Sequence, residues 1–412
     1  MRISPPRLLA LLAAFAVAAP AEAKEPPGWV VTWGTAQQEP EPHNALPAGA
    51  LADATLRQLV RTSIAGKTFR VRVSNAFGKA PLTILGVNAA RAPDPASSRI
   101  DPATDRPLTF SGSRQVTIPA GAEYLSDPVD LDLPPLATVA VSMHVAEHPP
   151  VQTGHAGSRA TSYVARGNRL SAPELTEATK VDHWYQLSGI DVVAPGASAV
   201  AIVGDSITDG FGVKPNTNSR WTDFLAERLQ ASRRSRNIAV LNLGLGGNRV
   251  LRDGLGPNAA ARFERDVLAR SGVRWLVVLE GVNDLGGLTR DAPATPEQHR
   301  ALVADMLHAY AQMVAKARER GIRVIGATIL PYGGSAYYHP DAANEADRQA
   351  INTWIRAPGN VDAVIDFDRA MRDPGQPNRL RAEYDSGDGL HPSIAGYRAM
   401  AEAVPLSLFV RR

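Results

Sequence analysis

The chain has 412 residues, of which 44% are hydrophobic and 21% are charged, and its formal net charge is +3. This composition is typical of a globular protein with room for about two domains, and it excludes extensive disorder. The basic residues are dispersed along the chain, which argues against nucleic acid as a partner. Cysteine is absent from the sequence, so disulfides, a thiolate nucleophile and a lipidated cysteine are excluded.

The N-terminus has the pattern of an export signal. Arg2 and Arg7 precede the apolar run LLALLAAFAVAA at residues 8–19, and the small-residue segment AEA follows at residues 21–23. This order is typical of a secretory signal peptide. A membrane-spanning helix needs about 20 apolar residues, and this run is shorter. We therefore predict that residues 1–23 are a signal peptide, that the mature protein is secreted or periplasmic, and that it has no stable membrane anchor.

Residues 28–193 alternate between apolar and polar positions in short runs. In TFRVRVSNAFG, at residues 68–78, Phe69, Val71 and Val73 fall on one face and two arginines on the other. A period of two indicates β-strands. Further runs of this kind, separated by Pro, Gly and Asp turn signals, lie at residues 114–121, 127–135 and 137–145. The pattern predicts a β-sandwich domain over residues 28–193.

After the linker APGAS the pattern changes to apolar runs that alternate with helical segments. The first run, at residues 199–203, precedes an amphipathic helix that begins near Trp221. Four more strand candidates lie at residues 238–243, 274–279, 323–329 and 363–367. This alternation predicts an α/β domain over residues 197–412, with a parallel sheet covered by helices on both faces.

One helix of this domain is delimited by strong end signals. Thr295 is the expected N-cap, Pro296 lies in the first turn, and Gly321 follows the last turn. We therefore predict a long amphipathic helix between the third and fourth strands.

Polar segments follow the predicted strands. They are GDSITDG at residues 204–210, NLGLGGN at residues 242–248, EGVND at residues 280–284 and DSGDGLHP at residues 385–392. In an open parallel sheet the ligand crevice lies at the carboxyl ends of the strands. Each segment alone is also compatible with an ordinary turn. Their shared position after predicted strands is therefore the stronger indication of a functional site.

Together these four segments resemble the sequence blocks of the SGNH/GDSL hydrolase family, in the order that the family has. The resemblance covers residues 197–412. It implies a flavodoxin-like three-layer parallel sheet of the SGNH hydrolase type and a carboxylic ester hydrolase that uses no cofactor and no metal. The β-sandwich would then be an added N-terminal domain.

The resemblance assigns a serine, a histidine and an aspartate to catalysis. A serine hydroxyl needs a base, and imidazole has the side-chain pKa closest to neutrality. Ser206 is the expected nucleophile, His391 the base, and Asp388 the acid that orients the imidazole, because the Asp-x-x-His pair matches residue for residue. Asp385 competes for the orienting role, but its spacing from His391 does not match the motif.

By the same resemblance, three donors would form an oxyanion hole. They are the backbone N–H groups of Ser206 and Gly247 and the side-chain amide of Asn283. Two alternatives remain open from the residues alone. Gly247 also suits a simple turn, and Asn283 or its neighbour Asp284 also suits a helix N-cap.

Residues near these blocks are not assigned by the resemblance. Residues 284–295 are expected to form an extended loop that borders the substrate. Arg220 and Trp221 follow the nucleophile segment in the sequence and are candidates for substrate contact, although the position of Trp221 on an apolar helix face favours the core. The segment HVAEH, at residues 144–148, matches a zinc-protease pattern that requires a helix, but it ends an alternating strand and precedes two prolines. A structural role is therefore expected for His144 and His148.

The sequence thus predicts a secreted serine esterase for small-molecule or polymer-linked esters. Acetyl or short acyl groups on carbohydrate are the preferred substrates, because export and an added β-domain fit, by analogy, an enzyme that works on polymers. A lipase or lysophospholipase with the same residues is the first alternative, although no segment reads as a lid. A non-catalytic carbohydrate-binding surface protein is the second alternative, and no oligomeric state is predicted.

Overall fold

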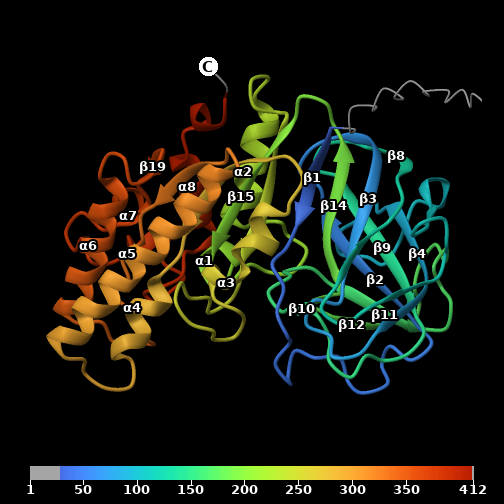
Figure 1. Cartoon of the computed structure of the whole chain (residues 1–412), viewed down its shortest axis with the longest axis horizontal. Helices are drawn as coiled ribbons and strands as arrows, with labels where there is room; N and C mark the ends of the chain where they lie inside the picture. Colours follow the sequence, from blue (N-terminus) through green and yellow to red (C-terminus); the bar gives the residue numbers. More distant parts are fainter. Residues whose placement is uncertain (1–27, 411–412) are drawn as a thin grey trace, which may run out of the picture.

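The computed structural model describes residues 28–410 in two halves that lie side by side (Figure 1). The predicted signal peptide lies outside the described residues. Within the described part of the chain, no helix is long and apolar enough to cross a membrane.

The N-terminal half consists of antiparallel sheets. One sheet has the order β1-β14-β3-β7, with β8 also paired to β3. Its strands are β1 (Trp29–Gly34), β14 (Leu187–Val193), β3 (Gly66–Ser74), β7 (Glu123–Leu125) and β8 (Val129–Leu133). The larger sheet has the order β12-β11-β2-β9-β4-β5, with β6 also paired to β4. Its strands are β12 (Thr179–Val181), β11 (Ser162–Arg166), β2 (Ala54–Arg61), β9 (Thr138–Val145), β4 (Leu82–Arg91), β5 (Arg106–Leu108) and β6 (Val116–Ile118). A short ribbon pairs β10 (Gly154–His155) with β13 (Trp184–Tyr185).

The alternation in β3 separates two buried surfaces. Phe69, Val71 and Val73 point into the β-domain core and are fully buried. On the opposite face, Arg72 binds Asp191 of β14 through a 2.8 Å ion pair and donates to Ser271 of the C-terminal half at 2.9 Å. The polar face of this strand therefore belongs to the boundary between the two halves.

The C-terminal half is built on five parallel strands. Their order is β16-β15-β17-β18-β19, which is the flavodoxin-like order, because the first strand lies between the second and the third. The strands are β15 (Ser198–Gly204), β16 (Ile238–Gly244), β17 (Val273–Leu279), β18 (Arg323–Ala327) and β19 (Ala363–Ile365). This arrangement, preceded by antiparallel sheets, confirms the predicted fold class.

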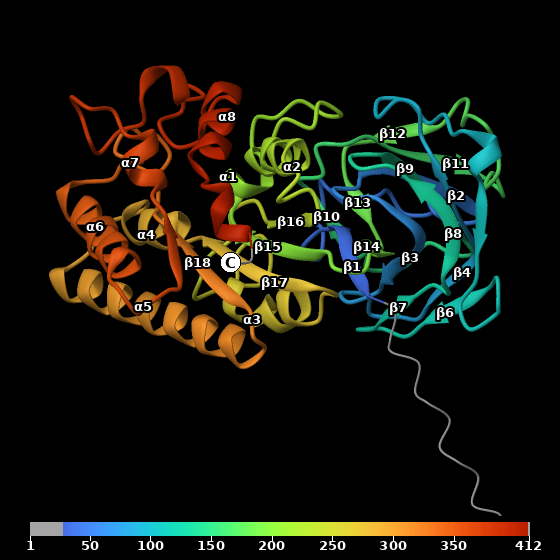
Figure 2. The same ribbon diagram turned by 90° about the horizontal axis from the view of Figure 1, so that it is seen from above.

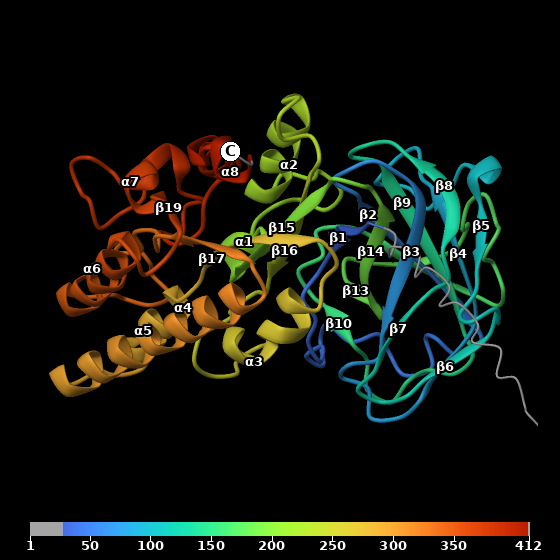
Figure 3. The ribbon, with the colours of Figure 1, turned by 45° about the horizontal axis from the view of Figure 1, so that its top comes forward.

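Helices cover both faces of the parallel sheet. Helices α3 and α5 lie on one face, and α2 and α8 lie on the other (Figures 2 and 3). The helices are α1 (Ser206–Asp209), α2 (Trp221–Ala231), α3 (Ala259–Phe263), α4 (Val282–Thr289), α5 (Pro296–Glu319), α6 (Ala342–Arg356), α7 (Phe367–Met371) and α8 (Ile394–Ala403). Short irregular helices lie at Pro102–Thr104, Glu264–Leu268, Ala382–Tyr384 and Leu406–Phe409.

Helix α5 begins with the predicted cap. The Thr295 side chain accepts from the backbone N–H of Gln298, and the Gln298 side chain accepts from the backbone N–H of Thr295. These reciprocal bonds satisfy two donors that the first turn would leave unpaired.

The extended loop expected at residues 284–295 is wrong for its first half, because α4 continues to Thr289. Two consecutive glycines made a helix unfavourable on propensity alone. A Cβ on Gly286 would lie 2.3 Å from the ring of Tyr338. The glycine therefore allows a close helix–ring contact, and tertiary packing outweighs local propensity.

The two halves share one hydrophobic core. A single cluster of buried side chains extends from the β-domain strands into the parallel sheet. Backbone groups also join the halves: the N–H of Val31 donates to the Ser271 carbonyl at 3.0 Å, and the N–H of Val240 donates to Ser63 Oγ at 3.0 Å. The β-domain is thus packed against the sheet edge formed by β16.

Candidate active site

Ser206 lies at the turn between the first parallel strand and α1. The Asp205 side chain caps α1 by accepting from the backbone N–H of Ile207 at 2.9 Å. Ser206 is the first residue of α1 and is only 7% exposed. The short helix therefore fixes the hydroxyl at the carboxyl edge of the sheet.

The histidine loop brings the two expected partners to this serine. Ser206 Oγ lies 2.8 Å from His391 Nε2, and His391 Nδ1 lies 2.6 Å from Asp388 Oδ2. The other Asp388 oxygen accepts from the backbone N–H groups of Leu390 and His391. These bonds fix the carboxylate against the imidazole, so a proton on Nδ1 leaves Nε2 as the acceptor facing serine.

Asp385 has a different place in the same loop. Its Oδ1 accepts from the backbone N–H groups of Gly387 and Gly389. It therefore stabilises the turn that carries Asp388, and the imidazole bonds to Asp388.

The environment lowers the pKa of both members of this pair, but for different reasons. Burial lowers the pKa of the His391 imidazole below its ordinary value, and the neighbouring Asp388 carboxylate offsets only part of that effect. Burial acts to raise the pKa of Asp388, but hydrogen bonds from the His391 backbone and ring outweigh it and hold this pKa below the ordinary value. At neutral pH the pair is therefore a neutral base and an ionised acid.

The expected oxyanion donors lie on two neighbouring segments. Gly247 has a φ of +67°, a left-handed conformation that glycine adopts without a steric penalty. The Asn283 Nδ2 donates to the Asn248 carbonyl at 2.7 Å, which leaves one of its two N–H groups available. Tyr338 Oη donates to Asn283 Oδ1 at 2.5 Å. The tyrosine therefore determines which way the amide points.

The alternative role of Asn283 and Asp284 as helix caps is wrong. The N-cap of α4 is Gly281, and no side chain caps that helix. Asp284 instead accepts from the backbone N–H groups of Val250 and Leu251 at 2.8 and 3.1 Å. Both residues thus connect α4 to the segment that follows Gly247.

Three carboxyl groups are buried around the nucleophile. Burial raises the pKa of Asp205 to about 7, raises that of Asp284, and raises that of Glu280 well above its ordinary value. Both Glu280 oxygens lack a hydrogen-bond partner within the described residues. Since a buried unpaired charge is costly, Glu280 is held as the neutral acid.

Arg220 and Trp221 do not line this site. The Trp221 ring is fully buried and packs edge-on against Phe367. Arg220 is also buried, and it donates to the backbone carbonyls of Asp209, at 3.0 Å, and of Ser158 in the β-domain. Arg220 therefore connects the nucleophile segment to the β-domain.

A β-domain segment that the sequence analysis missed contacts the nucleophile segment. His155 Nε2 lies 2.9 Å from Asp209 Oδ1, and its Nδ1 lies 2.9 Å from the Ala36 carbonyl oxygen. A Cβ on Gly157 would lie 1.7 Å from Asp209 Oδ2, so only glycine fits there. No spacing in the sequence marks these contacts, because they join separate halves of the chain.

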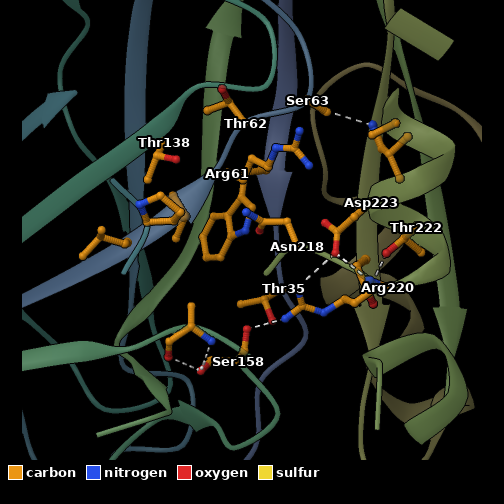
Figure 4. Close-up of a pocket in the computed structure, with 18 of the residues that line it drawn as sticks. Thr35, Arg61, Thr62, Ser63, Thr138, Ser158, Asn218, Arg220, Thr222 and Asp223 are labelled. Atoms are coloured by element: carbon orange, nitrogen blue, oxygen red, sulfur yellow. Dashed lines mark hydrogen bonds and ion pairs between the residues drawn. The ribbon is translucent and has the colours of Figure 1, made fainter. Parts of the chain in front are cut away.

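A cavity of about 60 Å³ lies between the halves, behind the nucleophile segment. Figure 4 shows side chains from the β-domain and from α2 facing one another across it. Its walls include the rings of Trp33 and Trp184 and the polar side chains of Asn218 and Arg220, but not the Ser206–His391 pair. This volume accommodates a few water molecules, and the cavity is separate from the candidate catalytic residues.

The segment HVAEH is part of the β-domain framework. His144 lies in strand β9 and its Nε2 is 2.8 Å from Asp53 Oδ1. His148 lies beyond the strand and contacts the backbone N–H of Leu51 and the side chain of Gln152. The two histidines thus have separate partners, and the described residues contain no group of three or more side chains arranged to hold a metal ion.

A parallel sheet with helices on both faces and a Ser-His-Asp cluster at its carboxyl edge defines a hydrolase domain. The family model described as the GDSL-like Lipase/Acylhydrolase family matches residues 202–399. Residues 202–399 therefore form a GDSL-like lipase/acylhydrolase domain, and the protein is a carboxylic ester hydrolase.

Solved structures resemble this half. An acetylxylan esterase from Geobacillus stearothermophilus is 24% identical with a TM-score of 0.39, over 50% of this chain and 93% of that chain. A GDSL-like lipase from Bacteroides thetaiotaomicron is 20% identical with a TM-score of 0.37, over 50% of this chain and 85% of that chain. No curated protein matches the sequence.

Proposed function

We propose that the protein hydrolyses acetyl or other short acyl esters of carbohydrates by forming an acyl-enzyme on Ser206. The observation that carries this proposal is the continuous chain of hydrogen bonds from Ser206 Oγ through the His391 ring to Asp388. No cofactor takes part in the reaction.

In the first half of the reaction Ser206 Oγ attacks the ester carbonyl carbon and transfers its proton to His391 Nε2. Negative charge develops on the carbonyl oxygen, and the backbone N–H groups of Ser206 and Gly247 and the free N–H of Asn283 Nδ2 stabilise it. Collapse of the intermediate breaks the bond to the alcohol oxygen, and His391 gives that oxygen its proton.

In the second half a water molecule attacks the acyl-enzyme. His391 accepts the proton of the water, the same three donors stabilise the second oxyanion, and the carboxylic acid leaves as Ser206 recovers its proton. Asp388 remains ionised throughout and stabilises the imidazolium that forms in each step.

Exposed aromatic side chains next to the site support a carbohydrate substrate. Phe211 is 45% exposed and stacks on His391, with 4.1 Å between ring centroids. Tyr337 is exposed and lies beside Tyr338, which bonds to Asn283. Such rings provide large apolar faces against which a sugar ring can pack.

The exposed Leu255, whose side chain would be 3.0 Å from a Cβ on Gly247, favours the lipase alternative. A series of 4-nitrophenyl esters of increasing acyl length separates the two functions. We expect kcat/KM to be highest for acetate and to fall with chain length, whereas a maximum at long chains would replace the esterase proposal with the lipase alternative.

The nucleophile is tested on the same substrates. We expect a fluorophosphonate probe to label Ser206, and Ser206→Ala to lose 4-nitrophenyl acetate hydrolysis without a change in the urea midpoint. Turnover that is equal in the wild type and in Ser206→Ala would show that the protein is a binding module.

We also propose that residues 1–23 are removed during export. The charge and apolar pattern of this segment supports the proposal. Mass spectrometry of the protein recovered from the periplasm or the medium should give a mature N-terminus at Lys24, and a chain retained with Met1 would contradict it.

A further inference from the structure

The loop at residues 156–161 places a β-domain arginine beside the catalytic residues. Arg159 has a left-handed backbone with a φ of +47°, which is uncommon for a residue with a Cβ. Such conformations persist where the surrounding structure enforces them. Here the neighbouring Gly157 packs against Asp209, and the Arg159 carbonyl accepts from the backbone N–H of Asn216.

The guanidinium of Arg159 is only weakly engaged by the residues around it. One Nη nitrogen forms an ion pair with the Asp209 carboxylate at 3.9 Å, which is beyond hydrogen-bond distance, and the buried Nε has no hydrogen-bond partner within the described residues. The side chain is 25% exposed. By contrast, the buried guanidiniums of Arg57 and Arg262 each donate several hydrogen bonds. The guanidinium therefore stands partly open at the site, although its Nε is buried.

Arg159 lies on the imidazole side of the site. Its Cζ is 5.9 Å from the centroid of the Phe211 ring, and Phe211 stacks directly on His391. The positive charge of Arg159 adds to the effect of burial in lowering the pKa of His391. Because His391 protonates the departing alcohol, the alcohol part of an ester occupies this side of the site.

We propose that Arg159 binds a carboxylate on the alcohol part of the substrate, so that the β-domain selects acyl esters of acidic carbohydrates. This inference rests on the function proposed for Ser206 and His391. The guanidinium fork matches a carboxylate in shape and charge. The exposed face of Phe211 provides the adjoining apolar surface for the ring that carries the carboxylate.

Two acetate esters that differ in one charge test the proposal: 4-acetoxybenzoate, with a free carboxylate, and its neutral methyl ester. The measured quantity is the ratio of their kcat/KM values in the wild type, Arg159→Gln and Arg159→Lys. Arg166→Gln is the matched control, because Arg166 is an exposed arginine of the same domain, in β11.

We expect Arg159→Gln to lower the ratio by about tenfold to a hundredfold, as for the loss of a charged hydrogen-bonded pair. Arg159→Lys should recover part of the ratio, and Arg166→Gln should leave it unchanged. An equal loss on both esters, with a lower urea midpoint, would make Arg159 a structural partner of Asp209 and overturn the proposal.

A second substrate pair tests whether Arg159 recognises the alcohol part or the acyl part of the ester. Mono(4-nitrophenyl) glutarate and 4-nitrophenyl pentanoate differ by a carboxylate on the acyl part. A dependence on Arg159 for this pair alone would overturn the assignment to the alcohol part. If Ser206→Ala removes hydrolysis of the neutral esters but Arg159→Gln changes no ratio, only this inference fails. If hydrolysis is independent of Ser206, the proposed function fails as well.

Discussion

At the scale of single residues, the site depends on hydrogen bonds that orient two planar side chains. Asp388 fixes the imidazole of His391, and Tyr338 fixes the amide of Asn283. In both cases the orienting group acts through its neighbour.

Replacing Asp388 by asparagine should lower kcat by about 10⁴, as in the serine-protease template, because the imidazole loses its correct tautomer. Asp385→Asn should have a much smaller effect, because that carboxylate accepts only from backbone N–H groups of the loop. Steady-state kinetics on 4-nitrophenyl acetate measures both. Small effects at both positions would indicate that Ser206 and His391 work as a dyad.

Asn283→Ala should lower kcat by about 10² to 10³ and leave KM nearly unchanged, because the amide binds charge that exists only in the transition state. Tyr338→Phe removes the hydroxyl that orients the amide and should lower kcat by about tenfold with little change in KM. A raised KM with an unchanged kcat in either variant would indicate a role in substrate binding alone.

The acid limb of the pH profile should lie below pH 6.5. His391 must be neutral to accept the serine proton, so kcat/KM falls as pH drops through its pKa in the folded protein. Since burial lowers that pKa, activity should persist below the ordinary histidine value. An inflection in kcat/KM above pH 6.5 would contradict the expected environment of His391.

At the scale of the elements, the turns after the parallel strands contain buried groups that oppose stability. The end of β17 places Glu280 in a position where its pKa is raised well above 4.5 by burial. A carboxyl with a raised folded-state pKa loses stability as pH rises above its unfolded value, because folding then requires uptake of a proton.

Glu280→Gln should therefore stabilise the protein, and the gain should grow with pH by up to about 1.4 kcal/mol per pH unit above pH 4.5. Urea midpoints of the variant and the wild type, measured at several pH values, give this slope. Glu345→Gln is a suitable control because Glu345 is only partly buried and pairs with Arg348. A constant difference across pH would mean that Glu280 is ionised in the folded state.

At the scale of the whole molecule, the two halves form one packed unit. They share a continuous hydrophobic cluster. In addition, His155 of the β-domain and Arg220 both form hydrogen bonds to Asp209 of the nucleophile segment. The catalytic half alone would expose the apolar edge that the β-domain now covers.

We therefore expect a single cooperative unfolding transition, in which loss of tryptophan fluorescence and loss of esterase activity coincide in urea. The fragment 197–412 should not fold by itself. Gly157→Ala should destabilise the intact chain by about 1 to 3 kcal/mol, because its Cβ overlaps Asp209. Two separate transitions, or an active fragment, would show that the β-domain is only appended.

The sequence by itself determined the parallel sheet, its helical layers and the placement of Ser206, Asp388 and His391. The sheet and its helices follow from local patterns, since apolar runs define the strands and helical segments alternate with them. The three catalytic candidates came from the resemblance of four polar segments to the SGNH/GDSL family. The capped helix α5 was predicted from a local pattern, because its end signals lie within a few residues of its ends.

Only the tertiary structure decided the rest. Helix α4 replaces the first half of the expected loop because Tyr338 packs on Gly286, and the same tyrosine orients Asn283. His155 and Arg159 of the β-domain both contact Asp209 of the nucleophile segment, so these contacts join different halves of the chain. No periodicity or short motif encodes such contacts, because they arise from the way in which two separately patterned surfaces pack together.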